Sequence, residues 1–512
     1  MKVSRDLIAY NDLKRIIIEP GFCNLCGACE AACPVHALKV EGNKLKYIHD
    51  CAKFMEFCPI CYDICPFTEA LLLEALGFVT DAPNRAESIG YYRKIVLAQA
   101  TDEKLRKISH SGGIVTALLM HAIKTGFIDS AIASESEKET PIKVKPLLSL
   151  IPDDLLSTVD AKYFPSPVAT AFGKAVHEYG KAKIAFVGTP CHVRAIRKLE
   201  AWEHKIMDSL KLVIGLICLW SFSFPKLAKF LKETYGVKAD EVQRINLDKE
   251  YKILTKDGKT IAISIPEVEA HTINACKMCE DFTSELADIS VGGAHPLKEW
   301  SIVIIRTEIG EKIFEDAVKA KAIRVKEIEK EPEVYAHFVE MGILKKKYAT
   351  EEIERRKKRG EPVPPAFLRM LELLPRETSL LSNLKAEQIM TRKVMTVNPE
   401  TTAEEVLTLM TKHHHMGYPV LDEKGELVGI ITFDDIAKIP SSKRKEVLVK
   451  EITHKKLVTV YPDESVMDAY EKMSKHKIGR VLVVDKKNPK KLVGIITKHD
   501  IMHVLRWPMK RK

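Results

Sequence analysis

The stretch KIAFVGTPCHVRAIRKLEAW, residues 183–202, joins a short apolar run to an amphipathic segment through a tight turn. The run KIAFVG is typical of a buried strand, and the segment after the turn has the spacing of a helix that packs on a sheet. Cys191 stands in the turn. A cysteine in this place could be a nucleophile, a metal ligand or a small core residue, and the other cysteines of the chain bear on that choice.

The same alternation of apolar β-rich runs and amphipathic segments continues from about residue 90 to residue 345. It predicts an α/β sheet with helices on its faces. The segment RINLDKEYKILTKDGKTIAISIPEVE, residues 244–269, differs, because its KDG turn between two alternating stretches is typical of a β-hairpin. We therefore predict an α/β core with an antiparallel excursion.

The length of 512 residues implies about three domains. The longest apolar runs, such as LVIGLICLW at 212–220, fall far short of the ~20 residues of a membrane span, and the N-terminus has no apolar signal core. We therefore expect a cytoplasmic protein without a membrane span. The cytosol keeps thiols reduced, so the twelve cysteines need a role other than disulfide formation.

The net charge of +10 is concentrated near the C-terminus, because residues 384–512 hold 25 Lys and Arg against 17 Asp and Glu, a surplus of eight. Such a surface is often only solvated, but it also suits an anionic ligand. We expect no DNA partner.

Eight cysteines lie in two blocks, CNLCGACEAACP at 23–34 and CAKFMEFCPICYDICP at 51–66. Their doubled spacing is that of a two-cluster bacterial ferredoxin, in which the cysteine beside the proline crosses to the other cluster. The spacing predicts one [4Fe–4S] cluster on Cys23, Cys26, Cys29 and Cys65, and a second on Cys33, Cys51, Cys58 and Cys61.

The second block departs from the usual spacing, because six residues separate Cys51 from Cys58. This insertion puts Cys51 in question unless a short hairpin absorbs it. The alternative for both blocks is a pair of zinc sites.

Four cysteines remain, and two of them follow predicted strands of the core. The carboxyl ends of parallel strands meet at one edge of a sheet, and a loop could bring the C-x2-C pair of CKMC to that edge. The four thiols would then form a third [4Fe–4S] site on Cys191, Cys218, Cys276 and Cys279. The alternatives are packing for Cys218, a redox disulfide or half a zinc site for CKMC, and a nucleophilic Cys191 with His192 as its base.

The stretch SHSGGIVTALL, residues 109–119, places two glycines after a serine at the start of a predicted helix. Such a loop forms a tight turn, or it lets backbone N–H groups approach the pyrophosphate of a cofactor such as FAD.

Several of these stretches together resemble the coenzyme F420 hydrogenase/dehydrogenase beta-subunit family over about 90–320. The resemblance is carried by SHSGGIVTALL, VGTPCHVRAIRKL, the cysteine after IGLI, ACKMCEDFTSELADISVGG and WSIVIIRTEIGEKIFEDA. It implies an oxidoreductase with FAD and iron–sulfur clusters that exchanges hydride with F420. Its expected partner is an electron-transfer protein or a hydrogenase or dehydrogenase subunit, whereas other relatives reduce tetrapyrroles or other acceptors with ferredoxin.

The resemblance also assigns roles to residues. It implies that the four core cysteines are cluster ligands and that Ser111, Gly112 and Gly113 belong to the flavin- or phosphate-binding loop. Thr189, together with Pro190, would shape the loop that presents Cys191 beside the cofactors. No catalytic residue is identified.

Two departures from the family pattern leave the second substrate open. Gly292-Gly293 stands where the family often has Gly-Asp, and the segment YFPSPVATAF at 163–172 is altered.

After residue 384 the sequence repeats itself. VMTVNPETTAEEVLTLMTKHHHMGYPVLDEKGELVGIITFDDI aligns with LVTVYPDESVMDAYEKMSKHKIGRVLVVDKKNPKKLVGIITKHDI, which indicates two copies of one unit packed together. The copies resemble a tandem pair of CBS domains. This resemblance implies that the ribose and phosphate of an adenosine nucleotide contact Thr432, Asp435, Thr497 and Asp500.

The alternative for this pair is a dimerisation module with an empty cleft, and in either case we expect a homodimer. The run His413-His414-His415 suggests a metal site, but its place in the repeat favours the surface of a helix end.

The predicted protein is a multidomain α/β chain. The domains are a two-cluster ferredoxin domain at 1–80, a flavin and iron–sulfur core at 90–345, a helical linker at 346–383 and CBS domains at 384–446 and 447–512. The predicted function is an iron–sulfur flavoprotein oxidoreductase that moves electrons between F420 and a partner protein under nucleotide control. The alternatives are a ferredoxin-dependent reductase of an organic substrate and a non-catalytic electron-transfer or nucleotide-sensing subunit.

Overall fold

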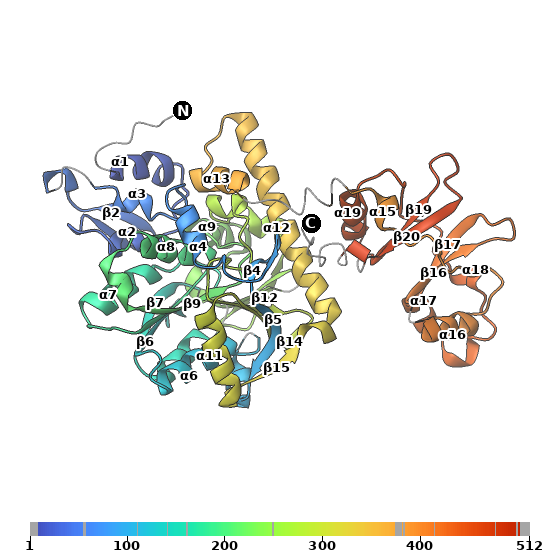
Figure 1. The fold of residues 1–512 in the computed structure, drawn as a ribbon, viewed down its shortest axis with the longest axis horizontal. Helices are drawn as coiled ribbons and strands as arrows, with labels where there is room; N and C mark the ends of the chain where they lie inside the picture. The colour runs from blue at the N-terminus through green and yellow to red at the C-terminus, as the bar shows by residue number, and fades with distance from the viewer. Residues whose placement is uncertain are drawn as a thin grey trace. The chain divides into compact units, whose positions relative to one another are not determined.

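The structure is a computed structural model, shown as a ribbon in Figure 1. It describes residues 9–54, 58–109, 111–140, 142–159, 162–247, 250–373, 381, 384–413, 415–476, 478–497 and 500–501. The chain divides into two compact units, Met1–Pro375 and Arg376–Lys512. In these described ranges, no helix is both long and apolar enough to cross a membrane.

An eight-stranded mixed sheet forms the centre of the first unit, in the order β15-β5-β14-β13-β9-β8-β6-β7. Strands β6, β8, β9 and β13 are parallel, whereas β14, β15 and β7 run antiparallel to their neighbours. The strands are β5 (Lys94–Ala100), β6 (Ser130–Ser136), β7 (Val144–Ser149), β8 (Ile184–Gly188), β9 (Leu210–Leu216), β13 (Ile289–Ala294), β14 (Leu297–Ile305) and β15 (Ile323–Glu327). This sheet confirms the predicted α/β class.

Helices cover both faces of the sheet. Strand β8 is buried throughout, with Val187 in the core on one face and Phe186 in the core on the other. This two-sided burial explains why KIAFVG is an unbroken apolar run. One face carries α5 (Glu103–Ile108), α6 (Ile114–Lys124) and α11 (Glu308–Lys319), and the other carries α7 (Val168–His177) and α8 (Pro190–Ala201).

The N-terminal lobe, residues 9–80, packs against α7. The Ala169 amide donates to the carbonyl of Cys26 at 3.1 Å, and the Thr170 hydroxyl donates to Glu30 at 2.9 Å. Gly27 has a φ of 85°, and a Cβ there would lie 2.2 Å from the Thr170 Oγ1, so this approach requires glycine. The lobe contains α1 (Tyr10–Leu13), the π-helix η1 (Lys14–Ile18), α2 (Ala28–Ala31), the hairpin β1 (Leu38–Glu41) and β2 (Lys44–Tyr47), the 3-10 turn η2 (Cys51–Lys53), α3 (Ile60–Asp63) and α4 (Leu72–Gly77).

The predicted excursion is a three-stranded antiparallel sheet. Its hairpin turns at Gly258, with a φ of 86°, and the Thr255 amide donates to the Lys259 carbonyl at 2.9 Å. Its strands are β10 (Val242–Leu247), β11 (Tyr251–Thr255) and β12 (Thr260–Ile263), between α9 (Phe224–Tyr235) with η5 (Ala239–Glu241) and α10 (Ile265–Glu269) with η6 (Asn274–Met278). The chain then returns to the main sheet. Short connecting elements elsewhere are β3 (Asn84–Ala86), β4 (Gly90–Tyr92), η3 (Pro152–Thr158), η4 (Lys205–Ser209) and η7 (Ile328–Lys330).

A long helix, α12 (Pro332–Arg359), crosses the predicted boundary between core and linker at 345/346, and α13 (Pro365–Leu373) follows it. Ile353 and Phe367 lie in the same buried cluster as Phe22 of the N-terminal lobe. The Phe367 ring also meets that of Phe67 edge-on, with centroids 5.9 Å apart. Much of the segment predicted as a linker is therefore packed within the first unit.

The second unit shows the internal repeat as two matching substructures. Strands β16 and β17 pair with Val420 opposite Gly429, and β19 and β20 pair with Val483 opposite Gly494, each with an irregularity at the next residue. The first copy contains α15 (Ala386–Ile389), α16 (Ala403–His413), β16 (Gly417–Leu421), β17 (Leu427–Thr432), α17 (Phe433–Ala437) and η8 (Ser441–Lys443). The second contains α18 (Val449–Ile452), β18 (Thr459–Val460), α19 (Val466–His476), β19 (Arg480–Val484) and β20 (Leu492–Thr497).

Candidate functional site

Two of the core cysteines stand at one edge of the sheet, as their positions after strands predict. Strands β8 and β9 are parallel, with Gly188 opposite Gly215. Cys191 follows β8 in the first turn of α8, and Cys218 follows β9 by two residues. Both thiols therefore lie at the carboxyl edge of the parallel strands, where α/β proteins bind ligands.

The turn that presents Cys191 is held by a capping box. Thr189 is the N-cap of α8, and Pro190 occupies the first helical turn. The Thr189 side chain accepts from the backbone amide of His192, and the His192 side chain accepts from the backbone amide of Thr189. The Thr189 hydroxyl lies 3.0 Å from the His192 Nδ1 and 3.3 Å from the Cys191 Sγ. Thr189 thus orients the thiol directly.

The same contacts argue against a nucleophilic cysteine. Burial raises the pKa of Cys191 and lowers the pKa of His192 to about 4. A nucleophilic pair needs the opposite arrangement, a thiolate beside a base that takes its proton near neutral pH.

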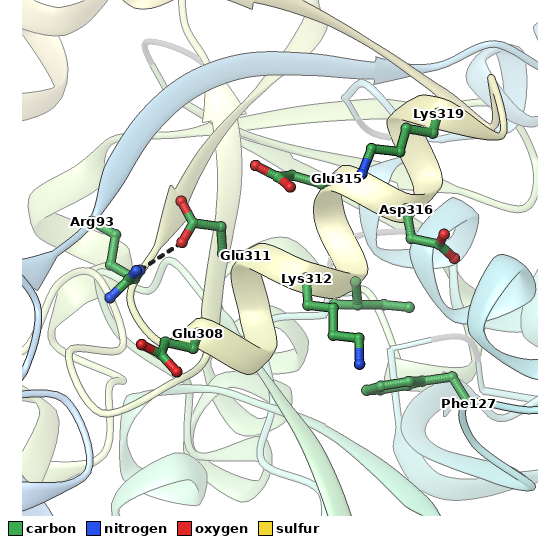
Figure 2. Close-up of a pocket in the computed structure, with 9 residues that line it drawn as sticks. Arg93, Phe127, Glu308, Glu311, Lys312, Glu315, Asp316 and Lys319 are labelled. Atoms are coloured by element: carbon green, nitrogen blue, oxygen red, sulfur yellow. Dashed lines mark hydrogen bonds and ion pairs between the residues drawn. The ribbon is translucent and has the colours of Figure 1, made fainter.

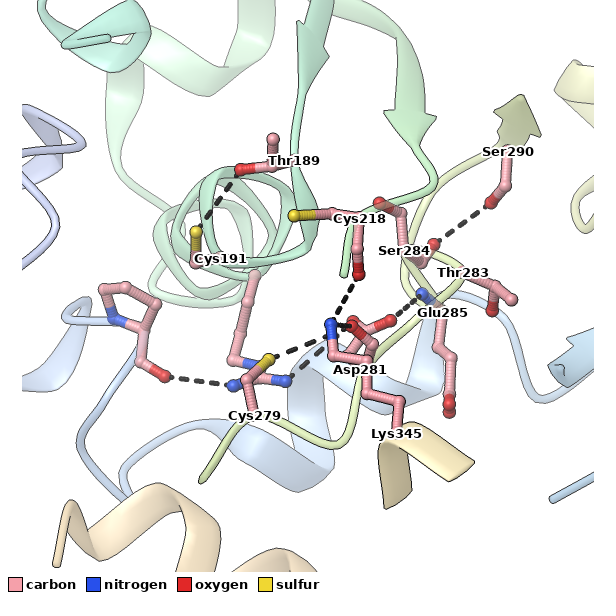
Figure 3. Close-up of polar contacts among 12 residues, drawn as sticks. Thr189, Cys191, Cys218, Cys279, Asp281, Thr283, Ser284, Glu285, Ser290 and Lys345 are labelled. Carbon is pink, nitrogen blue, oxygen red and sulfur yellow. Dashed lines mark hydrogen bonds and ion pairs between the residues drawn. The ribbon is translucent and has the colours of Figure 1, made fainter. Parts of the chain in front are cut away.

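The C-x2-C pair completes a quartet of thiols at this edge. Turn η6 brings Cys276 and Cys279 to the same cavity as Cys191 and Cys218, which together we call the core site. Figure 3 shows three of these thiols, those of Cys191, Cys218 and Cys279, together with Lys345, which bonds to the backbone of Cys218. The Cys276 Sγ accepts from the Ser221 amide at 3.5 Å, and the amide of Cys218 donates to Phe282 at 2.9 Å.

The eight cysteines of the N-terminal lobe divide into two further cavities in the crossed pattern that their spacing predicts. One cavity, which we call the proximal site, is lined by Cys23, Cys26, Cys29 and Cys65. The other, which we call the distal site, is lined by Cys33, Cys51, Cys58 and Cys61. Cys61 also borders the proximal cavity.

Cys51 reaches the distal site despite the insertion after it. Cys51 begins the 3-10 turn η2, which Asp50 caps. This turn stands where a short hairpin was expected to absorb the extra residues. The Tyr47 hydroxyl accepts from the Cys51 amide at 2.8 Å and lies 3.3 Å from its Sγ. Residues 55–57 of the insertion lie outside the described residues.

Neighbouring sites have lining residues in common. Cys61 borders both the distal and the proximal cavity, and Asn24 and Phe67 border both the proximal and the core cavity. Asn24 is buried between the two cavities, and its side chain lies beside the Cys191 thiol, where its hydrogen bond opposes the rise in the pKa of Cys191. The order along the protein is therefore distal, proximal, core.

The donor set of each site is four cysteine thiols around one cavity. A cubane takes one thiolate on each of its four irons, so such a donor set fits a [4Fe–4S] cluster.

Burial makes these cysteines unsuited to existing as free thiolates. It raises the pKa of Cys65 and of Cys218 to about 12, with a nearby lysine opposing the shift in each case. Burial also lowers the pKa of Lys198 to about 7, against the opposing effect of Cys65. In each pair, the thiolate form of the cysteine and the charged form of the lysine favour each other.

The SGG loop lies at the same edge of the sheet as the core site, after β5. The Gly112 amide donates to the Ser301 Oγ at 3.1 Å, and the Ser111 Oγ lies 3.1 Å from the same oxygen. A Cβ on Gly112 would lie 2.7 Å from the carbonyl of Ala98, and Gly113 has a φ of 71° at the start of α6. Both glycines thus have a packing reason, and the loop is not among the described residues that line the core cavity.

The two departures from the family pattern have different surroundings. A Cβ on Gly292 would lie 2.6 Å from Ile217, so that position needs glycine, whereas a Cβ on Gly293 would meet nothing within 4 Å. In the segment 163–172, Pro165 lines the core cavity.

In the repeat unit, the predicted nucleotide-contacting residues form the same capping pair twice. Asp435 accepts from the Thr432 amide at 2.9 Å and from its hydroxyl at 2.6 Å. Asp500 accepts from Thr497 in the same way, at 2.8 and 2.7 Å. His454 also lies 2.8 Å from Asp435.

The histidine run stands at a helix end, as its place in the repeat predicts. Helix α16 ends at His413, His414 lies outside the described residues, and the ring of His415 lies 5.6 Å from that of Tyr418.

Another hollow lies along α11, shown in Figure 2. It is lined by charged side chains, and Arg93 pairs with Glu311 there at 2.8 Å. None of the predicted site residues lines it.

Models of known protein families match the chain in the same order as the lobe, the core and the repeat unit described above. The two family models of the coenzyme F420 hydrogenase/dehydrogenase beta subunit match 95–172 (N-term) and 181–331 (C terminus). A 4Fe-4S binding domain matches 16–39, and the CBS domain matches 386–442 and 449–506.

Individual relatives agree. The chain is 32% identical over 280 residues to the coenzyme F420 hydrogenase subunit beta of Methanothermobacter thermautotrophicus, which covers 54% of this chain and 99% of that protein. It is 29% identical over 361 residues to the coenzyme F420-dependent sulfite reductase of Methanocaldococcus jannaschii, covering 68% of this chain and 52% of the relative.

Among solved structures, a chain of the F420-reducing [NiFe] hydrogenase complex from Methanosarcina barkeri superposes with a TM-score of 0.51 at 26% identity, over 55% of this chain and 98% of that one. The chain therefore belongs to the coenzyme F420 hydrogenase/dehydrogenase beta-subunit family of oxidoreductases, with an iron–sulfur domain before the family's core and a CBS pair after it.

Proposed function

We propose that the protein is an iron–sulfur flavoprotein that moves electrons between coenzyme F420 and a one-electron partner protein. The observation that carries this proposal is the series of three cysteine quartets with shared walls. We assign a [4Fe–4S] cluster to each of the distal, proximal and core sites. When bound, such a cluster carries one electron, and a bound FAD exchanges either one electron or a hydride.

The choice of F420 as hydride carrier rests on what the relatives share. Their names include an F420 hydrogenase, an F420-dependent sulfite reductase and an F420-dependent formate dehydrogenase. The second reactant differs among them, whereas F420 is common to all three. We infer that residues 90–345 exchange hydride with F420 through FAD and that residues 1–80 exchange single electrons with the partner.

The chain's own residues position and insulate this path. Thr189 orients the Cys191 thiol, and α7 fixes the lobe on the core through Ala169 and Thr170. Apolar side chains such as Phe67 separate neighbouring sites and exclude water. We place Ser111, Gly112 and Gly113 beside the flavin, because their loop lies at the edge of the sheet that holds the core site.

The test uses anaerobically purified protein followed by visible absorption. Added F420H2 is expected to bleach the flavin and cluster bands within the mixing time or shortly after it. NADPH is the matched control, because it donates a hydride without the deazaflavin ring. Bleaching by NADPH or by a reduced one-electron carrier, with none by F420H2, would contradict the assignment of F420.

We further propose that the CBS pair binds an adenosine nucleotide and controls this transfer, with Thr432, Asp435, Thr497 and Asp500 at the ligand. The equivalent geometry of the two Thr–Asp pairs and the basic surplus of residues 384–512 support it. AMP or ATP is expected to change the rate of cluster reduction by F420H2. Identical rates over a full titration of both nucleotides would contradict the proposed control of electron transfer by the CBS pair.

A further inference from the structure

Two lysines are buried beside predicted cluster ligands. Lys198, on α8, is 0% exposed, and its ammonium donates to the backbone carbonyl of Cys65. It also donates to the carbonyl and the hydroxyl of Thr68, at 3.0 and 2.9 Å. All three acceptors are uncharged oxygens. A fully buried ammonium whose hydrogen-bond partners are all neutral needs negative charge near it. Glu69 and Asp63 supply part of that charge from a distance, and Cys65 in its thiolate form adds to it.

Lys345, on α12, occupies the equivalent place at the core site. It is 8% exposed, and its ammonium donates to the carbonyls of Cys218 and Asp281 at 2.5 and 2.7 Å, as Figure 3 shows. The carboxylate of Asp281 also lies 3.8 Å from the buried guanidinium of Arg194. Lys345 therefore hydrogen-bonds to backbone carbonyls and not to a carboxylate, and its ammonium lies beside the Cys218 ligand position with Asp281, which Arg194 also faces, as the neighbouring carboxylate.

The distal site lacks this feature. Among the described residues, no lysine or arginine donates to the backbone of its cysteines as Lys198 does to Cys65 and Lys345 does to Cys218. In the part of the chain that the structure describes, no Lys or Arg is among the main electrostatic influences on Cys58 and Cys61, and two tyrosines, Tyr10 and Tyr47, line the cavity. The lysines of the neighbouring surface, such as Lys46 and Lys53, are exposed, so water and salt screen their charge.

We propose that Lys198 and Lys345 are positioning residues that stabilise the reduced, more negative state of the proximal and core centres, so that electrons move inward from the distal site. This inference rests on the proposed function, because it needs clusters in the three quartets. A buried positive charge next to a centre raises its reduction potential, because each added electron then meets a compensating charge in a medium of low dielectric constant.

The inward bias favours electron transfer from the N-terminal lobe to the core, and it suits one net reaction when the donor protein is reducing enough. The N-terminal lobe takes electrons from a one-electron donor protein, and the core passes them to the oxidised hydride carrier. Each inward step oxidises the outer centre by one electron and reduces the inner one by one electron, with no bond made or broken. Two such electrons and two protons from solvent convert one molecule of oxidised F420 to F420H2.

The test is a potentiometric titration of the anaerobic holoprotein, followed by electron paramagnetic resonance. The proximal signal is identified by its loss in Cys65→Ser and the core signal by its loss in Cys191→Ser. Lys198→Gln removes the charge but keeps an N–H donor, and it is expected to shift the proximal equilibrium at least tenfold toward the oxidised form, about 59 mV for one electron. Lys345→Gln is expected to do the same at the core signal.

Two kinds of control separate charge from packing. Lys198→Arg and Lys345→Arg retain the charge and are expected to keep potentials near those of the wild type. Lys347→Gln removes a charge from the same helix as Lys345, but this side chain is 28% exposed and lies 3.8 Å from Glu351, so no shift is expected.

Unshifted potentials in iron-replete Lys198→Gln and Lys345→Gln would overturn the proposal. A distal potential above those of the other two sites in the unmodified protein would overturn it as well, and this measurement needs no variant to fold. Either result leaves the proposed function intact if F420H2 still reduces the protein. The absence of iron would instead remove the proposed function itself.

Discussion

Replacing Cys191 with serine is expected to remove about four of about twelve irons per chain and to slow electron transfer from F420H2 to a one-electron dye by at least about 100-fold. Serine offers a hard, protonated oxygen where the cluster needs a soft thiolate. Cys191 is the ligand that α8 contributes to the core site, and the capping box around Thr189 holds it in place. Iron analysis and stopped-flow reduction of the dye give both quantities.

The matched control for this change is Met278→Leu. Met278 is fully buried between Cys276 and Cys279 but is not a candidate ligand, and leucine conserves its volume. This variant is expected to keep its iron and its rate. A Cys191→Ser protein with its full iron content and an unchanged dye rate would contradict the assignment of the core site.

Replacing Cys65 with serine is expected to remove the proximal centre and leave the distal centre in place. Cys65 belongs to the second cysteine block by sequence, but it lies in the cavity of Cys23, Cys26 and Cys29. Because the proximal site connects the other two, the variant is expected to exchange electrons between lobe and core at least about 100-fold more slowly. Flavin reduction by F420H2 is expected to stay unchanged.

The matched variant is Cys58→Ser, from the same block, which lines the distal cavity. It is expected to remove the distal signal and keep the proximal one. Electron paramagnetic resonance of the two reduced variants distinguishes the centres. The reverse result, with loss of the distal signal in Cys65→Ser, would show that the ligands do not cross between blocks.

Much of this site follows from local sequence. The crossed grouping in the N-terminal lobe follows from the two C-x2-C-x3-C-P runs, because so short a spacing lets the cysteines wrap only one cluster. The placement of Cys191 follows from an unbroken apolar strand before it and a helix after it. The duplicate Thr–Asp pairs follow from the internal repeat.

Other features depend on tertiary contacts that no local pattern encodes. Lys198 belongs to the stretch HVRAIRKLEAW, whose basic residues are typical of a solvent-facing helix side. The N-terminal lobe covers that side of α8, so Lys198 meets Cys65 and Thr68 instead of water. The spacing of Cys191, Arg194 and Lys198, three and then four residues apart, was the available signal that all three share one face of α8.

Lys345 was missed for a related reason. It lies in a run of three lysines at 345–347, a pattern typical of solvent, and the predicted domain boundary stood at the same point. In the structure α12 begins at Pro332 and packs along the first unit, which buries Lys345 and Lys346 while Lys347 reaches the surface. The SGG loop also depends on a tertiary contact. Gly112 lies so close to the Ala98 carbonyl that the position needs glycine, and this packing accounts for a motif that the sequence alone also allowed as a phosphate site.

The central claim is that all twelve cysteines hold iron, and the most direct test is the iron and acid-labile sulfide content of protein purified without oxygen. We predict about twelve of each per chain, together with one FAD. A colourless protein that holds zinc, or whose cysteines are joined as disulfides, would contradict the account.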